Sequence, residues 1–414
     1  MLSIKQKLYE LERQSAGGKQ VVEIEKNELV DSLPYKKLEQ LNCTLVYRNH
    51  QSYVLREKRY ALQFEHGGFP LKHFATISAK DFAYLAADEN YVNLTPEDYL
   101  FIDTETTGLA GGTGTFIFLI GIGFLTGNEF IVRQYLMPDF AVEAAVLQDI
   151  LKIISNFSGF ISYNGKSYDI PLLKTRLILN RLDAKQFDNM QHVDLLHCSR
   201  RLWKKFTKCD LQSIERKVLG FTRKNDVPGE DIPAIFFKFI KDKDLSPLAP
   251  VLRHNVIDLL SMVSIISQAI VTIRGETALS LYDARAVFHL LDRVGETEQA
   301  LQSTLLPQEN CDLQLLFEKS MVLKRLGKMT EAVPIWQRII QEKSNFEPAY
   351  VELAKYFEHI EKDYQKALSF IERAKRSKEI ATTLFPEKEV SFTEDWNHRQ
   401  KRVQKKLSLH ACRT

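Results

Sequence analysis

Two carboxylates stand two positions apart in the sequence, directly after a short apolar run. Asp103 and Glu105 follow residues 100–102, which read Leu-Phe-Ile. Alternate residues of a strand point to the same side, so both side chains are expected to project together from the end of a buried strand. Adjacent anions repel one another unless a cation compensates them. Hard oxygen ligands of this kind suit Mg²⁺ or Mn²⁺, so the pattern predicts a divalent metal site here.

Two more acidic residues lie in settings that suit the same chemistry. Asp169 follows a second apolar run and precedes a segment that begins with Pro171 and reads as a helix. Its alternative role is structural, because an acid in the first turn stabilises a helix by itself. His254 and Asp258 are four residues apart on a predicted long helix, and therefore lie on one face. Their alternative role is that of a hydrogen-bonded polar pair.

Predicted strands and helices place these residues at the ends of elements. Three strands in succession are followed by alternating helices and strands, which indicates an α/β fold with a mixed sheet flanked by helices. The predicted strands are residues 100–102, 116–124, 130–137, 159–163 and 192–196, and the predicted helices are 141–154, 171–182 and about 248–273. Residues 96–272 are therefore predicted to form one domain. Residues 1–95 form an N-terminal region of uncertain fold, with a strand within residues 52–64.

The sequence from residue 276 onwards is helical in character and repeats itself. Gly295, Gly327 and Lys362 are each followed five positions later by alanine, at Ala300, Ala332 and Ala367. This recurrence resembles the tetratricopeptide helix–turn–helix unit and predicts a stack of helical repeats over residues 276–380. A generic helical bundle is the alternative. Residues 381–414 form a basic tail, and a run of charge of this kind is typical of a solvated, disordered segment.

Basic residues gather beside the predicted domain's last strand. Residues 199–217 contain seven Lys or Arg against two acids, with Trp203 and Phe206 between them. Such a segment can bind phosphates and stack bases, or it can be a solvated helix face with core aromatics. Glycines at residues 111–114 read as a hairpin turn rather than a phosphate loop. His192, Asp194 and His197 read as a buried hydrogen-bonded set rather than as metal ligands.

Composition limits the class of protein. Lys and Arg number 56 and Asp and Glu 53, so any basic surface for nucleic acid has to be local. Five cysteines without a CxxC pair indicate neither a disulfide framework nor a zinc knuckle. Residues 1–17 lack the apolar core of a signal peptide. The uncharged residues 106–128 contain seven glycines and read as a buried strand or hairpin. We expect a cytoplasmic protein that does not enter a membrane.

Taken together, the four acids resemble the signature of the DEDD (DnaQ-like) 3′–5′ exonucleases, which have the ribonuclease-H fold. Asn164, Tyr168 and Asp169 are similar to the second motif of the proofreading domains of family-B polymerases. More specifically, the chain resembles the YprB-like family of ribonuclease-H-like domain proteins over roughly residues 96–272. The segments that carry this resemblance are residues 108–114, 163–169, 192–196, 200–203, 226–229 and 254–255.

The resemblance implies phosphodiester hydrolysis of single-stranded DNA or RNA by two Mg²⁺ or Mn²⁺ ions. Asp103 would bridge both ions, Glu105 and Asp258 would complete one site, and Asp169 would bind the second ion through water. His254 occupies the register in which related enzymes carry a tyrosine, and either takes a proton from the attacking water or orients it. The residues expected to bind substrate are Asn164, Tyr168, Arg200, Arg201, Lys204 and Lys205. The alternative is a non-catalytic nucleic-acid-binding module whose repeats recruit a protein partner.

Overall fold

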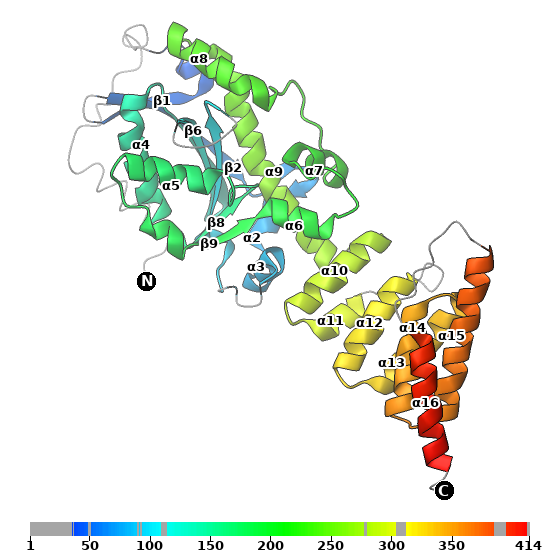
Figure 1. The fold of residues 1–414 in the computed structure, drawn as a ribbon. Coiled ribbons are helices and arrows are strands. Elements are labelled where there is room, and N and C mark those ends of the chain that lie inside the picture. Colours follow the sequence, from blue (N-terminus) through cyan, green and yellow to red (C-terminus); the bar gives the residue numbers. More distant parts are fainter. Residues whose placement is uncertain are drawn as a thin grey trace. The chain divides into compact units, whose positions relative to one another are not determined.

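A computed structural model describes residues 35, 37–48, 51–88, 91, 93–108, 114–276, 280–303, 312–384 and 395–411. Contacts divide the chain into two units, residues 1–303 and 304–414. Figure 1 shows an α/β arrangement in the first unit and helices alone in the described part of the second. The predicted fold class, a mixed sheet flanked by helices and followed by a helical region, is confirmed.

A seven-stranded sheet forms the centre of the first unit. The first five strands across this sheet are antiparallel to one another, and the last two continue the sheet in parallel. Across the sheet the order is β1 (Cys43–Arg48), β2 (Gln51–Ala61), β7 (Glu129–Leu136), β6 (Ile117–Thr126), β5 (Tyr99–Thr106), β8 (Gly159–Ser162) and β9 (Gln191–Asp194). The residues predicted as three successive strands and two later ones therefore pair as one sheet. Residues 43–61 of the N-terminal region extend that sheet, and β3 (Glu65–His66) pairs with β4 (Phe69–Pro70) outside it.

Helices cover both faces of this sheet (Figure 1). The helices of this unit are α2 (Lys72–Ala75), α3 (Ala79–Ala86), α4 (Glu143–Ile154), α5 (Asp169–Leu179), α6 (Leu195–Leu202), α7 (Leu211–Val218), α8 (Ile232–Asp242), α9 (Ala249–Ile273), α10 (Leu281–Arg293) and α11 (Thr297–Ser303), of which α10 contacts α6 and α9. Alternation along β5 decides which side chains meet which helix. Leu100 and Ile102 join the core cluster beneath α4 and α5. Phe101 points the other way and packs against Phe74 of α2, with ring centroids 5.1 Å apart.

Helix α9 is the central helix of the unit on the side of Phe101. Twenty of its 25 residues are buried, and it contacts β5, β6 and β7. Within the described parts of the chain, Ser246–Ile273 is the one helical stretch long and apolar enough to cross a membrane. However, 89% of its most apolar window is buried inside the protein, as is usual for a core helix. Residues 117–126, from the uncharged segment, form the buried strand that was predicted.

The second unit consists of five helices within residues 312–384 and 395–411. They are α12 (Leu313–Arg325), α13 (Met329–Glu342), α14 (Glu347–His359), α15 (Tyr364–Leu384) and α16 (Trp396–Ala411). The alanines of the recurrence, Ala332 and Ala367, are fully buried here, as Ala300 is in the first unit. Gly295, Gly327 and Lys362 all have positive φ, which explains their common place at helix ends. The contacts group α10 and α11 with the first unit, whereas the predicted repeat region begins at residue 276.

The basic tail contains a packed helix, which differs from the expected solvated segment. In α16, Trp396 and Val403 are buried, and α16 packs against α15. Arg402 and Lys406 donate to Glu358 of α14, whose side chain is completely buried. Basic residues stabilise this helix because they surround a buried acid, a partner that charge composition alone does not reveal.

Candidate active site

Asp103 lies on β5 and faces α9. The side-chain amide of Asn255 donates to Oδ2 of Asp103 at 2.7 Å and to its backbone oxygen at 3.2 Å. Gly121 is the partner of Asp103 on β6. A Cβ atom built at Gly121 would lie 2.1 Å from Oδ1 of Asn255, so only glycine lets α9 approach the sheet this closely.

Asn255 is itself held by a buried glutamine that sequence reasoning missed. Nε2 of Gln134 on β7 donates to Oδ1 of Asn255 at 2.8 Å and to the carbonyl of Leu252 at 2.8 Å. Arg56 on β2 donates to Oε1 of Gln134 at 3.1 Å. Because Asn255 accepts from Gln134, its amide nitrogen is directed at Asp103. The available signal was a glutamine on the same side of β7 as the buried Val132 and Leu136.

Asp169 begins α5 and reaches β5 from the opposite face. Its Oδ1 accepts from Oγ1 of Thr104 at 2.6 Å and from the Thr104 amide at 3.1 Å. Thr104 lies between Asp103 and Glu105 and points away from them, so Asp169 and Asp103 make their hydrogen bonds on opposite sides of β5. Asp169 stands in the first turn of α5, as its structural alternative foresaw, and it also lies near the other acids.

The loop before Asp169 is fixed by Asp194. Oδ1 of Asp194 accepts from the amide of Asn164 at 2.8 Å and Oδ2 accepts from the amide of Lys166 at 3.0 Å. His192 lies 2.7 Å from Oγ of Ser162, and burial lowers the pKa of His192 to about 4. Asp194 and His192 thus belong to a hydrogen-bonded set, as predicted, whereas His197 is exposed.

Tyr168 ties the Asp169 loop to the end of β5. Its hydroxyl donates to the carbonyl of Gly108 at 2.8 Å and lies 3.0 Å from Oγ1 of Thr106. Asn164 has φ +66°, a left-handed conformation that asparagine tolerates better than most residues. Three of the four residues of the glycine turn predicted at 111–114, residues 111–113, lie outside the described residues.

Helix α9 presents His254 and Asp258 to a buried charged cluster. Arg223 donates to both oxygens of Glu215 on α7, at 2.6 and 2.7 Å, and also to Oδ1 of Asp258. Nδ1 of His254 lies 2.9 Å from Asp226, and its Nε2 lies 3.5 Å from Oδ2 of Asp258. Arg223 and Glu215 were not predicted as site residues, and Asp226 was noted only within the family resemblance.

The acids of the site disfavour one another's ionised form. Burial raises the pKa of Asp103 and Glu105 well above the usual carboxyl range, and the charges of Asp258 and Asp169 add to the effect. Burial also raises the pKa of Asp169 to about 6, although its hydrogen bonds from Thr104 act in the opposite direction. Four carboxylates from β5, α5 and α9 are therefore close enough to interact.

The donor chemistry fits a divalent cation, with Glu105 as the clearest indication. Among the described residues, Oε1 of Glu105 is a buried oxygen without a hydrogen-bond partner. A buried carboxylate oxygen of this kind needs a proton or a cation. Within the same residues, no three His, Cys, Asp or Glu side chains converge as a ready-made metal site. Asp103 and Glu105 would hold an ion, with Asp169 beside them.

The four basic residues predicted to bind substrate fall into two groups, one bonded within the protein and one exposed to solvent. Arg201 donates to the carbonyl of Leu85, and Lys205 donates to Asp283 at 2.8 Å, so both have partners within the first unit. Arg200 and Lys204 are exposed. Trp203 is buried and serves the core, as the structural alternative for the basic segment foresaw.

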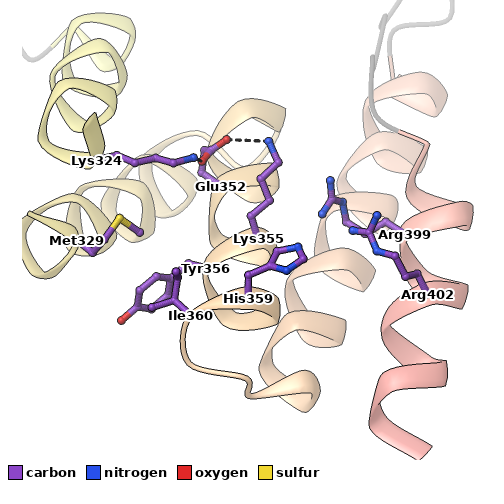
Figure 2. Close-up of a pocket in the computed structure, with 9 residues that line it drawn as sticks. All are labelled: Lys324, Met329, Glu352, Lys355, Tyr356, His359, Ile360, Arg399 and Arg402. Carbon is purple, nitrogen blue, oxygen red and sulfur yellow. Dashed lines mark hydrogen bonds and ion pairs between the residues drawn. The ribbon is translucent and has the colours of Figure 1, made fainter. Parts of the chain in front are cut away.

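A separate cavity of about 580 Å³ lies in the second unit (Figure 2). Its lining side chains are Lys324, Met329, Glu352, Lys355, Tyr356, His359, Ile360, Arg399 and Arg402. Five of these nine are basic and one is acidic. Lys355 bonds Glu352 at 3.1 Å, and Lys324 bonds the same carboxylate. One carboxylate shared by two ammonium groups leaves net positive charge at the cavity.

Comparison with known proteins agrees with this architecture. Residues 100–270 match the RNase_H superfamily. The uncharacterized protein YprB of Bacillus subtilis (strain 168) is 31% identical over 396 residues, which cover 90% of this chain and 93% of YprB. The matched segment contains β5, α5 and α9, the three elements that carry the acids. The chain therefore belongs to the family of YprB and carries a domain of the RNase_H superfamily at residues 100–270.

Proposed function

We propose that this protein is a metal-dependent nuclease of the DEDD (DnaQ-like) type, a 3′–5′ exonuclease that hydrolyses single-stranded DNA or RNA. The observation that carries the proposal is the buried, unpartnered Oε1 of Glu105 beside Asp103, with Asp169 and Asp258 near enough to raise the pKa of both. An RNase_H superfamily domain supports the coarser assignment to nucleic acid.

Asp103, Glu105 and Asp169 would hold Mg²⁺ or Mn²⁺, of which the sequence resemblance implies two. When bound, such ions activate water and neutralise charge on the phosphate. Asn255 fixes the orientation of Asp103 through its 2.7 Å hydrogen bond. His254, with Nδ1 held by Asp226, would accept the proton of the attacking water at Nε2. Asn164, Tyr168 and the basic segment would position the strand.

A cleavage assay tests this function. Oligonucleotides of DNA and RNA labelled at the 5′ end should shorten stepwise from the 3′ end with Mn²⁺, and EDTA should stop the reaction. Asp103→Asn should abolish cleavage while the protein stays folded. Asp188→Asn is the matched control, because Asp188 is an exposed acid that pairs with Lys174 and is not one of the four candidate acids. Binding of nucleic acid without any cleavage would instead support the non-catalytic module.

We further propose that the helical repeats of the second unit, tetratricopeptide-like in their recurrence, dock a protein partner. The cavity of Figure 2 is lined by five basic side chains and by apolar side chains that include Met329 and Ile360. Charge complementarity favours an acidic polypeptide segment that carries one apolar side chain.

Peptide binding tests this docking site. A fluorescent peptide of Glu and Asp with one central Leu should bind the full chain, and salt should weaken the complex. Lys355→Glu should remove binding, whereas Lys366→Glu, at another exposed lysine of the same unit, should not. A preference for oligonucleotide over the acidic peptide would overturn the proposal of a protein partner.

A further inference from the structure

We propose that Arg223 acts as a built-in cation at Asp258, so that the site binds a single divalent ion instead of two. The inference rests on the proposed nuclease function and concerns how that function is arranged. Its starting point is the bond that Nη2 of Arg223 donates to Oδ1 of Asp258.

Arg223 is fixed in place by more than one acid. It makes a two-point contact with Glu215, Nε to Oε2 at 2.7 Å and Nη2 to Oε1 at 2.6 Å, and Nη1 lies 3.2 Å from Asp226. Its side chain is 5% exposed and that of Glu215 is 1% exposed. Moving the guanidinium away would leave the buried Glu215 carboxylate without its cation, which is strongly unfavourable.

Both oxygens of Asp258 face nitrogen groups. Oδ1 accepts from Arg223, and Oδ2 lies 3.5 Å from Nε2 of His254. A second divalent cation at Asp258 would stand against a guanidinium that cannot lose its charge, and like charges in a buried site repel strongly. Asp258 is thus a positioning residue for Arg223 and His254, and its charge is already compensated.

The other three acids of the site, Asp103, Glu105 and Asp169, are the ones left to bind a metal ion. Glu105 keeps a free buried oxygen, and Asp103 is oriented by Asn255 through one of its two oxygens. These two side chains project from the same side of β5, with Asp169 held nearby by Thr104. One ion held by Asp103 and Glu105, with Asp169 beside it, satisfies the free oxygen, and Asp258, the fourth acid, already has Arg223 as its cation.

Counting bound Mn²⁺ tests the inference on the full chain. Isothermal titration and electron paramagnetic resonance should both give one ion per wild-type molecule. Asp258→Asn should leave that stoichiometry and its dissociation constant unchanged, whereas Asp103→Asn should weaken binding at least about tenfold. Arg223→Gln should expose Asp258 and raise the count to two, and Arg216→Gln, at an exposed arginine of α7, should keep it at one.

The outcomes separate the two proposals. Two ions in the wild-type protein, or loss of the single ion in Asp258→Asn, would overturn the role of Arg223 and leave the nuclease standing. No Mn²⁺ bound at millimolar concentration would overturn metal-dependent hydrolysis itself, and this inference with it. The wild-type and Asp258→Asn counts decide the question even where Arg223→Gln fails to fold.

Discussion

The side-chain amide of Asn255 donates a 2.7 Å hydrogen bond to Oδ2 of Asp103, across the contact between α9 and the central strand β5. Asn255 is completely buried, and its oxygen is bound by Gln134. The amide therefore has one orientation, in which a nitrogen faces the carboxylate. This bond links the position of the candidate metal ligand directly to the packing of the longest helix in the first unit.

Replacing Asn255 with alanine should weaken Mn²⁺ binding by about 10 to 100-fold, the usual effect of losing a partner that orients a ligand. Isothermal titration of the variant measures this directly. Asn156→Ala, which removes an amide bonded only to helix carbonyls of α4, should leave the affinity unchanged. Equal affinities in the wild-type protein and Asn255→Ala would show that Asp103 does not need its partner.

Metal-free protein should become less stable as the pH rises through about 4 to 6. The pKa of Asp169 is raised to about 6 in the folded state, above the value of about 3.9 for an unfolded aspartate. Between these values the folded state binds more protons than the unfolded state, so the free energy of unfolding falls with rising pH. The raised pKa of Asp103 and Glu105 acts in the same direction, since both groups also bind more protons in the folded state.

Melting temperatures in EDTA at pH 5 and pH 7.5 check this sign. Asp103→Asn and Asp169→Asn should both reduce the difference between the melting temperatures at pH 5 and pH 7.5. Mg²⁺ added to the wild-type protein at pH 7.5 should raise its melting temperature. The expectation fails if stability increases with pH in the wild-type protein.

His254→Ala should lower kcat by about 10² to 10⁴-fold, the range for a lost general base. Its Nδ1 lies 2.9 Å from Asp226, so Asp226→Asn should reduce the rate in the same direction by disturbing the imidazole. His254→Tyr should keep part of the rate. Measuring kcat and melting temperature on one preparation separates catalysis from structure: a normal kcat with a lowered melting temperature would mark His254 as a structural residue.

Gly121→Ala should destabilise the protein by about 1 to 3 kcal/mol, the cost of forcing extra volume into a packed interior. The new Cβ would lie 2.1 Å from Oδ1 of Asn255. Urea unfolding at 25 °C measures the change. Gly229→Ala introduces a Cβ with no neighbour within 4 Å and should be close to neutral.

A chain that ends after Ser303 should fold and cleave a short oligonucleotide, because residues up to 303 form one unit. A chain that ends at residue 275 loses α10, whose Val287 and Leu291 are buried and whose Asp283 bonds Lys205. Burial of such side chains contributes about 1.5 to 3 kcal/mol each, so the shorter chain should melt at a clearly lower temperature. Thermal melting of both fragments gives the comparison.

Local patterns were sufficient to predict much of the sheet and the acids on it. The apolar run before Asp103 and the spacing of His254 and Asp258 correspond to β5 and α9 of the structure. The four predicted carboxylates lie close enough to interact, and their role as a site stays a prediction. Periodicity along the chain carries this information because it depends on neighbours in sequence.

The partners of those acids could not be predicted in the same way. Arg223 is one of 56 Lys and Arg residues, and only the fold brings it to Glu215 and Asp258. Gln134 and Asn255 lie 121 residues apart. Pairing of β2 with β7 is equally non-local, which is why a strand was predicted within residues 52–64 but the fold of residues 1–95 was not. Contacts of this kind depend on topology, which periodicity does not encode.

The pairing of β2 with β7 also has a consequence for synthesis. Residues 43–61 leave the ribosome well before Glu129–Leu136, the strand with which β2 pairs. About 70 residues separate the two segments. At about 5 to 20 residues per second, the β1–β2 hairpin waits several seconds with one edge unpaired. An open strand edge is a template for pairing with other chains. The nascent polypeptide is thus most exposed to aggregation before β7, the strand that pairs with β2, has been translated.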